Sequence, residues 1–314
     1  MPVPSTNAPA CAGLRAIRLW LAVLLLALGA GVAYHRTWQA PFVLDDSAAI
    51  TENATLRSLW PLPGPLSPPT GGLPISGRPL VNLSLALNHA ISGEAVWSYH
   101  ATNFGLHLLA GLALFAVLRR TLARPVVDAR LRGDAEMVAM AVSALWLLHP
   151  LQTAAVTYVS QRSELLVSLC YLLTLYAVAR AATTERRGGW WGAVAVLAGL
   201  AGMASKEVMA SAPLMALLYD RTFFAGSFAA AWRARWKTYL GLMAGWALLA
   251  WLVFGTAGRG GTAGFGLDLT PLRYAATQAC AITRYIGLAF WPRPLVFDYG
   301  MHLEREAWLI VPCV

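Results

Sequence analysis

Residues 99–120 read YHATNFGLHLLAGLALFAVLRR, a mostly apolar run that closes on two arginines. Such a run can cross a bilayer as one α-helix, because about 20 residues at helical rise cover the hydrocarbon core. The rest of the chain has the same character: 58% of its 314 residues are hydrophobic, 12% are charged, and the mean hydropathy is +0.55. Soluble domains carry about 25% charged residues. The composition therefore excludes an ordinary soluble domain and predicts an all-α integral membrane protein with several spans.

Similar apolar runs recur along the chain. Spans or shorter helices are predicted at 17–34, 99–118, 137–148, 164–178, 190–220 and 238–254. Segment 190–220 is too short for two full spans and is interrupted by Ser205-Lys206-Glu207, so we expect two short helices that meet at a polar turn. Segment 271–290 carries Arg273, Gln278 and Arg284, and is predicted to be either an interfacial helix or a helix that lines a cavity.

These runs divide the chain into five regions. In order, they are a cytoplasmic N-terminus (1–16), a first transmembrane helix (17–34), a large periplasmic loop with an acidic pair (35–98), transmembrane helices two to seven (99–254), and a C-terminal region (255–314). That last region is expected to hold an outer loop, one helix and the start of a truncated further helix. Most of the 24 Lys and Arg fall on one side of this topology. The net charge of +9 is therefore attributed to the positive-inside rule, and not to nucleic-acid binding.

Polar residues gather on the opposite, outer side. Asp45 and Asp46 follow the first helix, and His100, Asn103 and His107 share one face near the start of the second. The later outer turns contribute His149, Arg162, Glu164, Lys206 and Glu207. Because ionisable residues at membrane depth are costly and usually face a partner or a wet cavity, one outward-facing polar site is predicted.

Each of these features also has a structural interpretation, which the sequence leaves open. The acidic pair can cap a short helix through its carboxylates. His100 and His107 can be buried histidines satisfied by hydrogen bonds, while Arg162 with Glu164 and Lys206 with Glu207 can form structural ion pairs. The histidines lack the HxxxH or CxxC spacing typical of metal sites, so no metal ligand is assigned.

Five stretches occur in an order that resembles a known family. They are FVLDDSAAITEN (42–53), SGRPLVNLSLALNHAISG (76–93), YHATNFGLHLLAGL (99–112), HPLQTAAVTYVSQRSELL (149–166) and ASKEVMASAPLMALLYD (204–220). From about residue 41 to 299 the chain is similar to the membrane part of the transmembrane, tetratricopeptide-repeat-containing O-mannosyltransferases and their bacterial relatives. Those proteins belong to the GT-C glycosyltransferases, as do the protein O-mannosyltransferases. The resemblance implies a polytopic GT-C-like helical bundle with a large outer first loop.

The resemblance also implies an activity. A hexosyl group, mannosyl or another, would pass with inversion from a polyprenyl-phosphate donor to a hydroxyl of a protein Ser/Thr, glycan or lipid acceptor. The reaction would take place at the outer, periplasmic face of a bacterial inner membrane. By analogy, an acidic residue of the first outer loop is the general base; we favour Asp45, with Asp46 orienting the acceptor or a cation. No cofactor is assigned, and a divalent cation is left open.

Other residues receive roles by the same analogy. Arg162, Lys206 and Arg78 are expected to bind the donor phosphate, because cations stabilise the charge that develops on the leaving group. Supporting or orienting roles are expected for His100, Asn103, His107, His149, Glu164 and Glu207.

Three features depart from the family pattern. The family motif commonly reads HPxxTE, whereas here Thr153 is followed by Ala154. Nothing after Pro294 shows the 34-residue period of tetratricopeptide repeats, and the chain stops in an apolar run, as expected of a fragment. A catalytically inactive membrane scaffold therefore stays open. A transporter built on the broken pair at 190–220 would need a matching pair elsewhere, which the sequence lacks.

Overall fold

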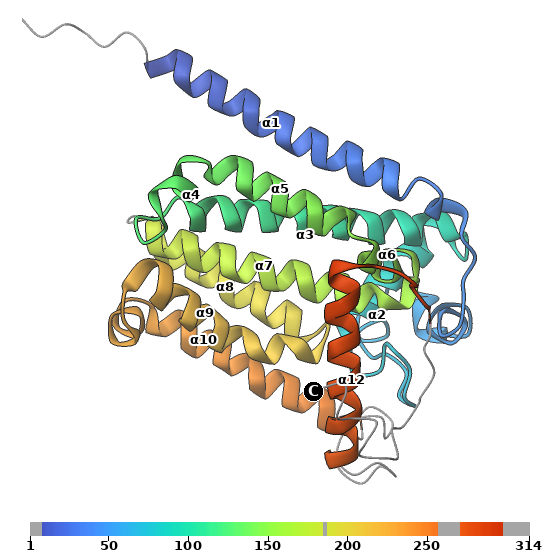
Figure 1. Ribbon diagram of the computed structural model, residues 1–314. Helices are drawn as coiled ribbons and strands as arrows, with labels where there is room; N and C mark the ends of the chain where they lie inside the picture. The colour runs from blue at the N-terminus through green and yellow to red at the C-terminus, as the bar shows by residue number, and fades with distance from the viewer. Residues whose placement is uncertain (1–7, 185–186, 257–270, 298–314) are drawn as a thin grey trace, which may run out of the picture.

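The structure is a computed structural model that describes residues 8–184, 187–256 and 271–297. Within these ranges every regular element is a helix, which confirms the predicted all-α class. The α-helices are α1 (Ala8–Ala33), α2 (Pro79–Ser92), α3 (Val96–Leu122), α4 (Ala129–Gly133), α5 (Ala135–Leu148), α6 (Thr153–Thr157), α7 (Arg162–Thr183), α8 (Gly188–Met203), α9 (Ala212–Asp220), α10 (Phe228–Phe254) and α12 (Pro271–Phe290). In Figure 1 the long helices from α1 to α10 run side by side, and α12 crosses one end of this bundle.

Three helices are long and apolar enough to cross a membrane. They are Val96–Leu122, Val159–Thr183 and Phe228–Phe254, which contain the spans predicted at 99–118, 164–178 and 238–254. Ile17–Ala33, Gly188–Met203 and Ala281–Phe290 are apolar but shorter. The chain is therefore a multi-pass membrane protein, although only some of the predicted spans reach full length within the described residues.

The span predicted at 137–148 is half of a broken element. Helix α5 ends at Leu148, and the chain turns by 50° before it continues through Pro150–Thr157. His149 adopts an extended conformation with ψ of 131°, as the residue before a proline usually does. A turn is therefore present at His149-Pro150, and it joins two parts of a single bent unit.

Segment 190–220 forms two short helices, α8 and α9, as predicted. The 3-10 helix η6 (Glu207–Ser211) lies between them, at the polar turn. Small residues let α8 approach α10 closely: a Cβ on Gly199 would lie 2.6 Å from Leu242 Cδ2, and one on Gly241 would lie 2.6 Å from Val196 Cγ2. Close contact at small residues is a common way for helices to associate within membranes, where water is absent as a driving force.

Helix α10 differs from the predicted element. It begins at Phe228, where Ser227 caps it, and it bends at Arg235, whose φ of −138° and ψ of 26° are not helical. The helix therefore includes Arg233, Arg235 and Lys237, which lie between the elements predicted at 190–220 and 238–254. The bend lets Arg235 pair with Asp220 at the end of α9, an attraction that a hydropathy pattern does not encode.

The long segment 35–98, which the sequence predicts to be an outer loop, is folded onto the bundle. It contains η1 (Thr37–Gln39), the π-helix η2 (Ser47–Thr51), η3 (Ala54–Leu56) and the 14-residue helix α2, which starts with Pro79 in its first turn. An apolar core joins this loop to α2, α3 and α7. Its buried members are Ala49, Ile50, Leu56, Ile75, Val81, Leu85, Ala86, Tyr99, Val159 and Leu166. The core fixes the position of the acidic pair, which directly precedes η2.

Helix α12 occupies 271–290, as predicted. It runs across the bundle helices in Figure 1, an orientation that favours the interfacial alternative over a lipid-facing span. The predicted outer loop after α10 and the predicted start of a further helix fall largely on residues 257–270 and 298–314, outside the described part of the chain.

Candidate active site

Asp46 is fully buried and serves as an anchor for its loop. Its Oδ1 accepts hydrogen bonds from the backbone N of Ser160 at 2.7 Å and from Ser160 Oγ at 2.6 Å. Its Oδ2 accepts a hydrogen bond from the backbone N of Val43 at 3.2 Å. With these contacts Asp46 ties the loop to η5 (Val159–Gln161) and faces away from solvent. The role expected for it, orienting an acceptor or a cation, does not fit this burial.

Asp45 is exposed, and Tyr158 holds it in place. The hydroxyl of Tyr158 donates to Asp45 Oδ2 at 2.9 Å and accepts a hydrogen bond from the backbone N of Asp45 at 3.1 Å. Burial, together with the hydrogen bond to Asp45, raises the pKa of Tyr158 to about 12. The phenol therefore stays protonated, and continues to donate, at any ordinary working pH.

The residue before Asp45 has a strained backbone. Leu44 has a φ of +48°, in the left-handed region that side chains other than glycine rarely adopt. Such a conformation costs roughly 1–3 kcal/mol and persists only where the surroundings enforce it. Here the amides on both sides of Leu44 are held, because Val43 N donates to Asp46 and Asp45 N donates to Tyr158.

An apolar hollow lies beside Asp45. Val43 and Leu44 line an open pocket together with Val296 and Phe297, and the Phe297 ring meets the Tyr158 ring edge-on at 5.2 Å. A second pocket, of about 270 Å³, continues from Val296 and Phe297 between α6 and α12. It is lined by Pro150, Leu151, Thr153, Ala154, Thr157, Tyr285, Leu288, Leu295, Val296 and Phe297. Ala154, which stands where the family motif has a glutamate, thus lies in a pocket that adjoins the acidic pair.

Arg162 is buried and its nitrogens are occupied by protein acceptors, which corrects its expected role in phosphate binding. Nε donates to Asn103 Oδ1 at 2.8 Å, and Nη2 donates to the carbonyl of Tyr99 at 3.0 Å. Nη1 donates to Asn88 Oδ1 at 2.6 Å and to the carbonyl of Ser84 at 3.0 Å. The side chain joins α2, α3 and α7, so it acts as an internal clamp and does not pair with Glu164.

The three polar residues on α3 also point inward. Asn103 binds Arg162 and donates to the carbonyl of Val156 at 3.3 Å. His100 Nε2 lies 2.9 Å from the carbonyl of Ala40, and His107 Nε2 lies 2.9 Å from the carbonyl of Leu147. All three are buried. Each histidine has a carbonyl partner at Nε2, whereas Nδ1 of both rings is buried with no hydrogen-bond partner among the described residues.

His149 shapes the bend after α5. Its Nδ1 accepts a hydrogen bond from the backbone N of Leu151 at 3.2 Å, and its Nε2 lies 3.1 Å from the carbonyl of Ala289 in α12. His149 therefore connects the bent unit to α12, next to the pocket that Ala154 lines. The supporting role expected for His149 stays a prediction.

Lys206 forms an ion pair with Glu164, and Arg78 forms one with Glu207. Arg78 Nη2 lies 3.4 Å from both carboxylate oxygens of Glu207. The pairings proposed from sequence neighbours, Arg162 with Glu164 and Lys206 with Glu207, are therefore wrong. The observed pairs connect the start of α7 and the turn before α2 to the polar turn between α8 and α9.

An apolar groove begins at Glu164. Its volume is about 310 Å³, and it follows one side of α7 towards Leu172. The lining residues are Leu114, Trp146, Glu164, Val167, Ser168, Tyr171, Leu172 and Val208. The groove thus has a charged pair at one end and side chains that are mostly apolar along its length.

Within the described residues, no group of three or more His, Cys, Asp or Glu is placed to hold a metal ion. The aspartates and histidines near the first helix are turned towards different partners. The residues at 8–184, 187–256 and 271–297 therefore form no preformed cage for the divalent cation that the sequence left open.

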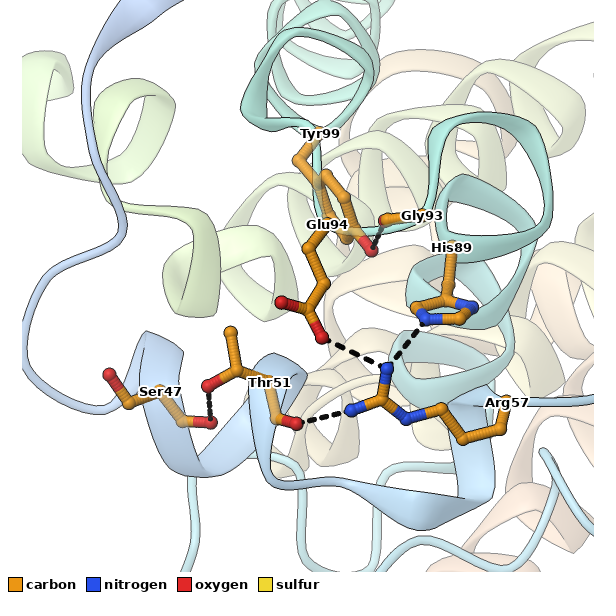
Figure 2. A network of polar contacts seen from close by, with 7 residues as sticks. All are labelled: Ser47, Thr51, Arg57, His89, Gly93, Glu94 and Tyr99. Carbon is orange, nitrogen blue, oxygen red and sulfur yellow. Dashed lines mark hydrogen bonds and ion pairs between the residues drawn. The ribbon is translucent and has the colours of Figure 1, made fainter.

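A polar network that the sequence did not indicate fastens the segment after the acidic pair (Figure 2). Arg57 donates to the carbonyl of Thr51 at 2.5 Å and to Glu94 Oε1 at 2.9 Å, and its Nη1 lies 3.0 Å from His89 Nε2. Thr51 Oγ1 in turn donates to the carbonyl of Ser47 at 2.8 Å, which closes η2. The network links η2 to the end of α2. A single arginine in a proline-rich loop carries no pattern that would have revealed it.

Comparison with known proteins identifies relatives over about 60% of this chain. The chain is 35% identical over 202 residues to "Protein O-mannosyl-transferase Tmtc2" of Drosophila melanogaster, an alignment that covers 60% of this chain and 20% of the fly protein. It is 31% identical over 198 residues to Tmtc1 of the same organism, covering 60% of this chain and 21% of that protein. The mouse protein TMTC2 is 32% identical over 202 residues, covering 60% and 22%.

The alignments thus span about a fifth of the length of these relatives. No family model matches the chain, and no solved structure matches it. The family resemblance expected from the five stretches is nevertheless confirmed: over 60% of its length, this chain is homologous to protein O-mannosyl-transferases of the Tmtc type.

Proposed function

We propose that the chain is a GT-C-type glycosyltransferase that moves a hexosyl group, mannosyl in the first instance, from a polyprenyl-phosphate donor to a hydroxyl acceptor. The names of the relatives support glycosyl transfer. The observation that carries the proposal is the state of Asp45, an exposed carboxylate held in one orientation by Tyr158 beside an open pocket. A base that must reach a substrate hydroxyl needs this combination of access and fixed geometry.

In the proposed reaction Asp45 acts as the general base. Its free carboxylate oxygen takes the proton of the acceptor hydroxyl as that oxygen forms a bond to the anomeric carbon. The bond from the anomeric carbon to the phosphate oxygen breaks on the opposite side, and the phosphate leaves with the electron pair. One displacement at one carbon inverts its configuration. Asp46 stabilises the loop from the interior and takes no part in the proton transfer.

The donor is proposed to lie along α7. Lys206, paired with Glu164 at the end of the apolar groove, is placed to offset negative charge on a phosphate, and Arg78 lies at the same polar turn. The groove offers apolar side chains to a polyprenyl chain, whose burial requires no specific polar contact. Tyr158, which holds Asp45, and Glu164 both belong to the short stretch 158–164, so the base and the charged end of the groove share one framework.

The acceptor is proposed to approach through the pocket between α6 and α12. Its lining is largely apolar, with Thr153 and Thr157 as polar members. A protein Ser/Thr is the acceptor that the relatives' names suggest, and a glycan or lipid hydroxyl would meet the same base. The positive-inside distribution supports a site on the outward face of the membrane. That the membrane is a bacterial inner membrane, with the site in the periplasm, belongs to the proposal alone.

Ala154 favours a second candidate, an inactive membrane scaffold. Ala154 lines the acceptor pocket at the position where the family motif has a glutamate. If that carboxylate is needed to bind acceptor or metal, the chain would keep the fold and lose the transfer. The two candidates differ in one measurable property, the movement of sugar.

The test is a transfer assay with membranes that contain the chain. Radiolabelled polyprenyl-phosphate mannose and, separately, the glucose form are supplied, and label is followed into protein, glycan and lipid fractions. Asp45→Asn is expected to lower transfer by about 100-fold or more, as loss of a general base does. Asp128→Asn is the matched control, because Asp128 is an exposed helix cap on a loop far along α3 from Asp45.

Two results would contradict the proposal. Transfer that survives Asp45→Asn would remove Asp45 as base. Absence of transfer from well-inserted wild-type protein, with either donor, would instead support the inactive scaffold.

A further inference from the structure

The two adjacent carboxylates are bound by different residues: Tyr158 binds Asp45, and Ser160 binds Asp46. Tyr158 contacts Asp45 through its hydroxyl, while Ser160 contacts Asp46 through its backbone N and its Oγ. One carboxylate is thereby drawn into the interior, and the other is left at the surface. The stretch 158–160 therefore holds Asp46 in the interior and Asp45 at the surface, next in the chain to Leu44, which lines the open pocket.

The contact between Tyr158 and Asp45 has two components that fix different degrees of freedom. Donation to Asp45 Oδ2 at 2.9 Å fixes the rotation of the carboxylate, and acceptance from Asp45 N at 3.1 Å fixes the backbone. The same contact helps to hold Leu44 at a φ of +48°. Among the residues that the structure describes, Tyr158 is the side chain to which Asp45 is hydrogen-bonded.

The Tyr158 ring is itself held. It is 7% exposed, and the ring of Phe297 meets it at 61° with 5.2 Å between centroids, which is the favoured edge-to-face arrangement. The charged groups that face the hydroxyl are Asp45 and Asp46. Both are acidic, so they disfavour a tyrosinate, and the raised pKa of Tyr158, about 12, keeps the hydroxyl a donor.

We propose that Tyr158 is the positioning residue of the general base: its hydroxyl holds one oxygen of Asp45 so that the other is directed at the acceptor hydroxyl. This inference rests on the proposed function. The carboxylate of Asp45 belongs to a loop, and an unheld loop carboxylate samples orientations in which proton transfer fails. Since small misplacements of a reacting group can cost about 100-fold in rate, the hydroxyl of Tyr158 contributes to kcat without touching substrate.

The experiment compares Tyr158→Phe with wild type in the membrane transfer assay. We expect kcat to fall about 10-fold to 100-fold, with the KM for acceptor changed less than about threefold, because the substrate contacts remain. The acidic limb of the rate profile against pH should also move to higher pH, because the ionised form of Asp45 loses a hydrogen-bond donor. A merely structural role for Tyr158 would lower the amount of active enzyme and leave the shape of the pH profile unchanged.

Tyr219→Phe is the matched control. Its hydroxyl lies 2.6 Å from Thr121 Oγ1, at the end of α3 remote from His100 and Asp45. The control removes one partly buried tyrosine hydroxyl with one side-chain partner, and it should leave both kcat and the pH profile unchanged. If Tyr158→Phe does not insert stably, Phe297→Leu replaces it, since it keeps the hydroxyl but removes the ring that orients it. That variant should show a several-fold drop in kcat and a pH shift in the same direction.

The outcomes separate this inference from the proposed function. If Asp45→Asn abolishes transfer while Tyr158→Phe and Phe297→Leu keep wild-type kcat and pH profile, Asp45 is the base and Tyr158 does not position it. If Asp45→Asn keeps full transfer, the proposed function fails first, whatever Tyr158→Phe does. Loss of kcat with a shifted pH limb in Tyr158→Phe, beside an inactive Asp45→Asn, supports both.

Discussion

Arg162 and Asn103 form a buried hydrogen bond between α7 and α3, from Nε to Oδ1 at 2.8 Å. The same guanidinium also satisfies Asn88 and two backbone carbonyls, so one side chain joins three helices in the interior of the protein. Lysine offers neither the planar fork nor the number of donors that this arrangement uses. The contact is therefore a structural element specific to arginine, although it lies a short distance along the chain from Tyr158.

The first prediction concerns Arg162→Met. The substitution would leave buried acceptors on Asn103 and Asn88 without donors, and each lost partner costs about 1–3 kcal/mol. We expect a large fall in the thermal unfolding midpoint of detergent-purified protein and a poor yield, with Arg162→Lys intermediate. The measurement is thermal unfolding alongside the KM for donor in the protein that remains folded. If Arg162→Met is instead stable and has a raised KM for donor, that result would support the phosphate-binding role that the sequence predicts for Arg162.

The second prediction separates the two neighbouring aspartates. Asp46→Asn should lower the free energy of unfolding by about 1.5–3 kcal/mol for each charged hydrogen bond it weakens, because Asp46 is buried and accepts from Ser160 and Val43. Asp45→Asn, at an exposed site, should change stability by less than about 1 kcal/mol. Chemical unfolding of both variants in the same detergent checks this. Equal stability losses would show that the buried and exposed assignments are incorrect.

The third prediction concerns Lys206 at the end of the groove. Lys206→Gln should raise the KM for a polyprenyl-phosphate donor about 10-fold, because a cation that offsets phosphate charge is lost. Glu164→Gln should not raise it, since that change removes only the carboxylate that competes for Lys206. Lys237→Gln, on α10 near Arg235, is the matched control. Unchanged donor KM in Lys206→Gln would exclude this end of the groove as the phosphate site.

Local hydropathy predicts the long spans well, because the length of an apolar run is a property of neighbouring residues. It also predicts the broken pair at 190–220, since the polar turn at Lys206 interrupts the run. Hydropathy fails to predict where α10 begins. The helix includes a basic segment before residue 238, and in that segment Arg235 forms an ion pair with Asp220. Hydropathy also counts the short apolar helix Ile17–Ala33 as a candidate span, because it does not measure how far a packed helix reaches.

The site was predicted in composition but not in arrangement. Arg162 and Lys206 are both cations beside predicted outer turns. Arg162 is enclosed by α2, whereas Lys206 lies at the end of the apolar groove, where it pairs with Glu164. That difference depends on where α2 packs, which no local pattern specifies. Tyr158 was not identified for a related reason: one tyrosine in a turn has no periodicity or spacing. Only its hydrogen bonds to Asp45 reveal it.

The fourth prediction compares a buried ion pair with an exposed one. Asp220 is fully buried and bound by Arg235 through Nε at 2.5 Å and Nη2 at 2.6 Å, with a further hydrogen bond from Tyr239. Asp220→Asn should cost about 3–5 kcal/mol, because it removes the fully buried carboxylate and leaves the partly buried guanidinium of Arg235 without its charged partner. Glu94→Gln, which breaks the exposed pair with Arg57, should cost at most about 1 kcal/mol. The thermal unfolding midpoint of Asp220→Asn should therefore lie clearly below that of Glu94→Gln. Similar midpoints would contradict the burial of Asp220.

The fifth prediction uses two glycines of α3. A Cβ on Gly111 would lie 2.4 Å from Cδ1 of Leu147, which is fully buried in α5 and has little room to move, whereas a Cβ on Gly105 would meet nothing within 4 Å. Gly111→Ala should therefore destabilise the bundle by about 1–3 kcal/mol through overpacking. Gly105→Ala should be neutral or slightly stabilising, because alanine favours the helix by up to about 1 kcal/mol. The unfolding midpoints of the two variants measure the contact between α3 and α5 directly, since helix propensity changes equally in both. Equal midpoints would show that these helices do not approach each other as closely as the position of Leu147 requires.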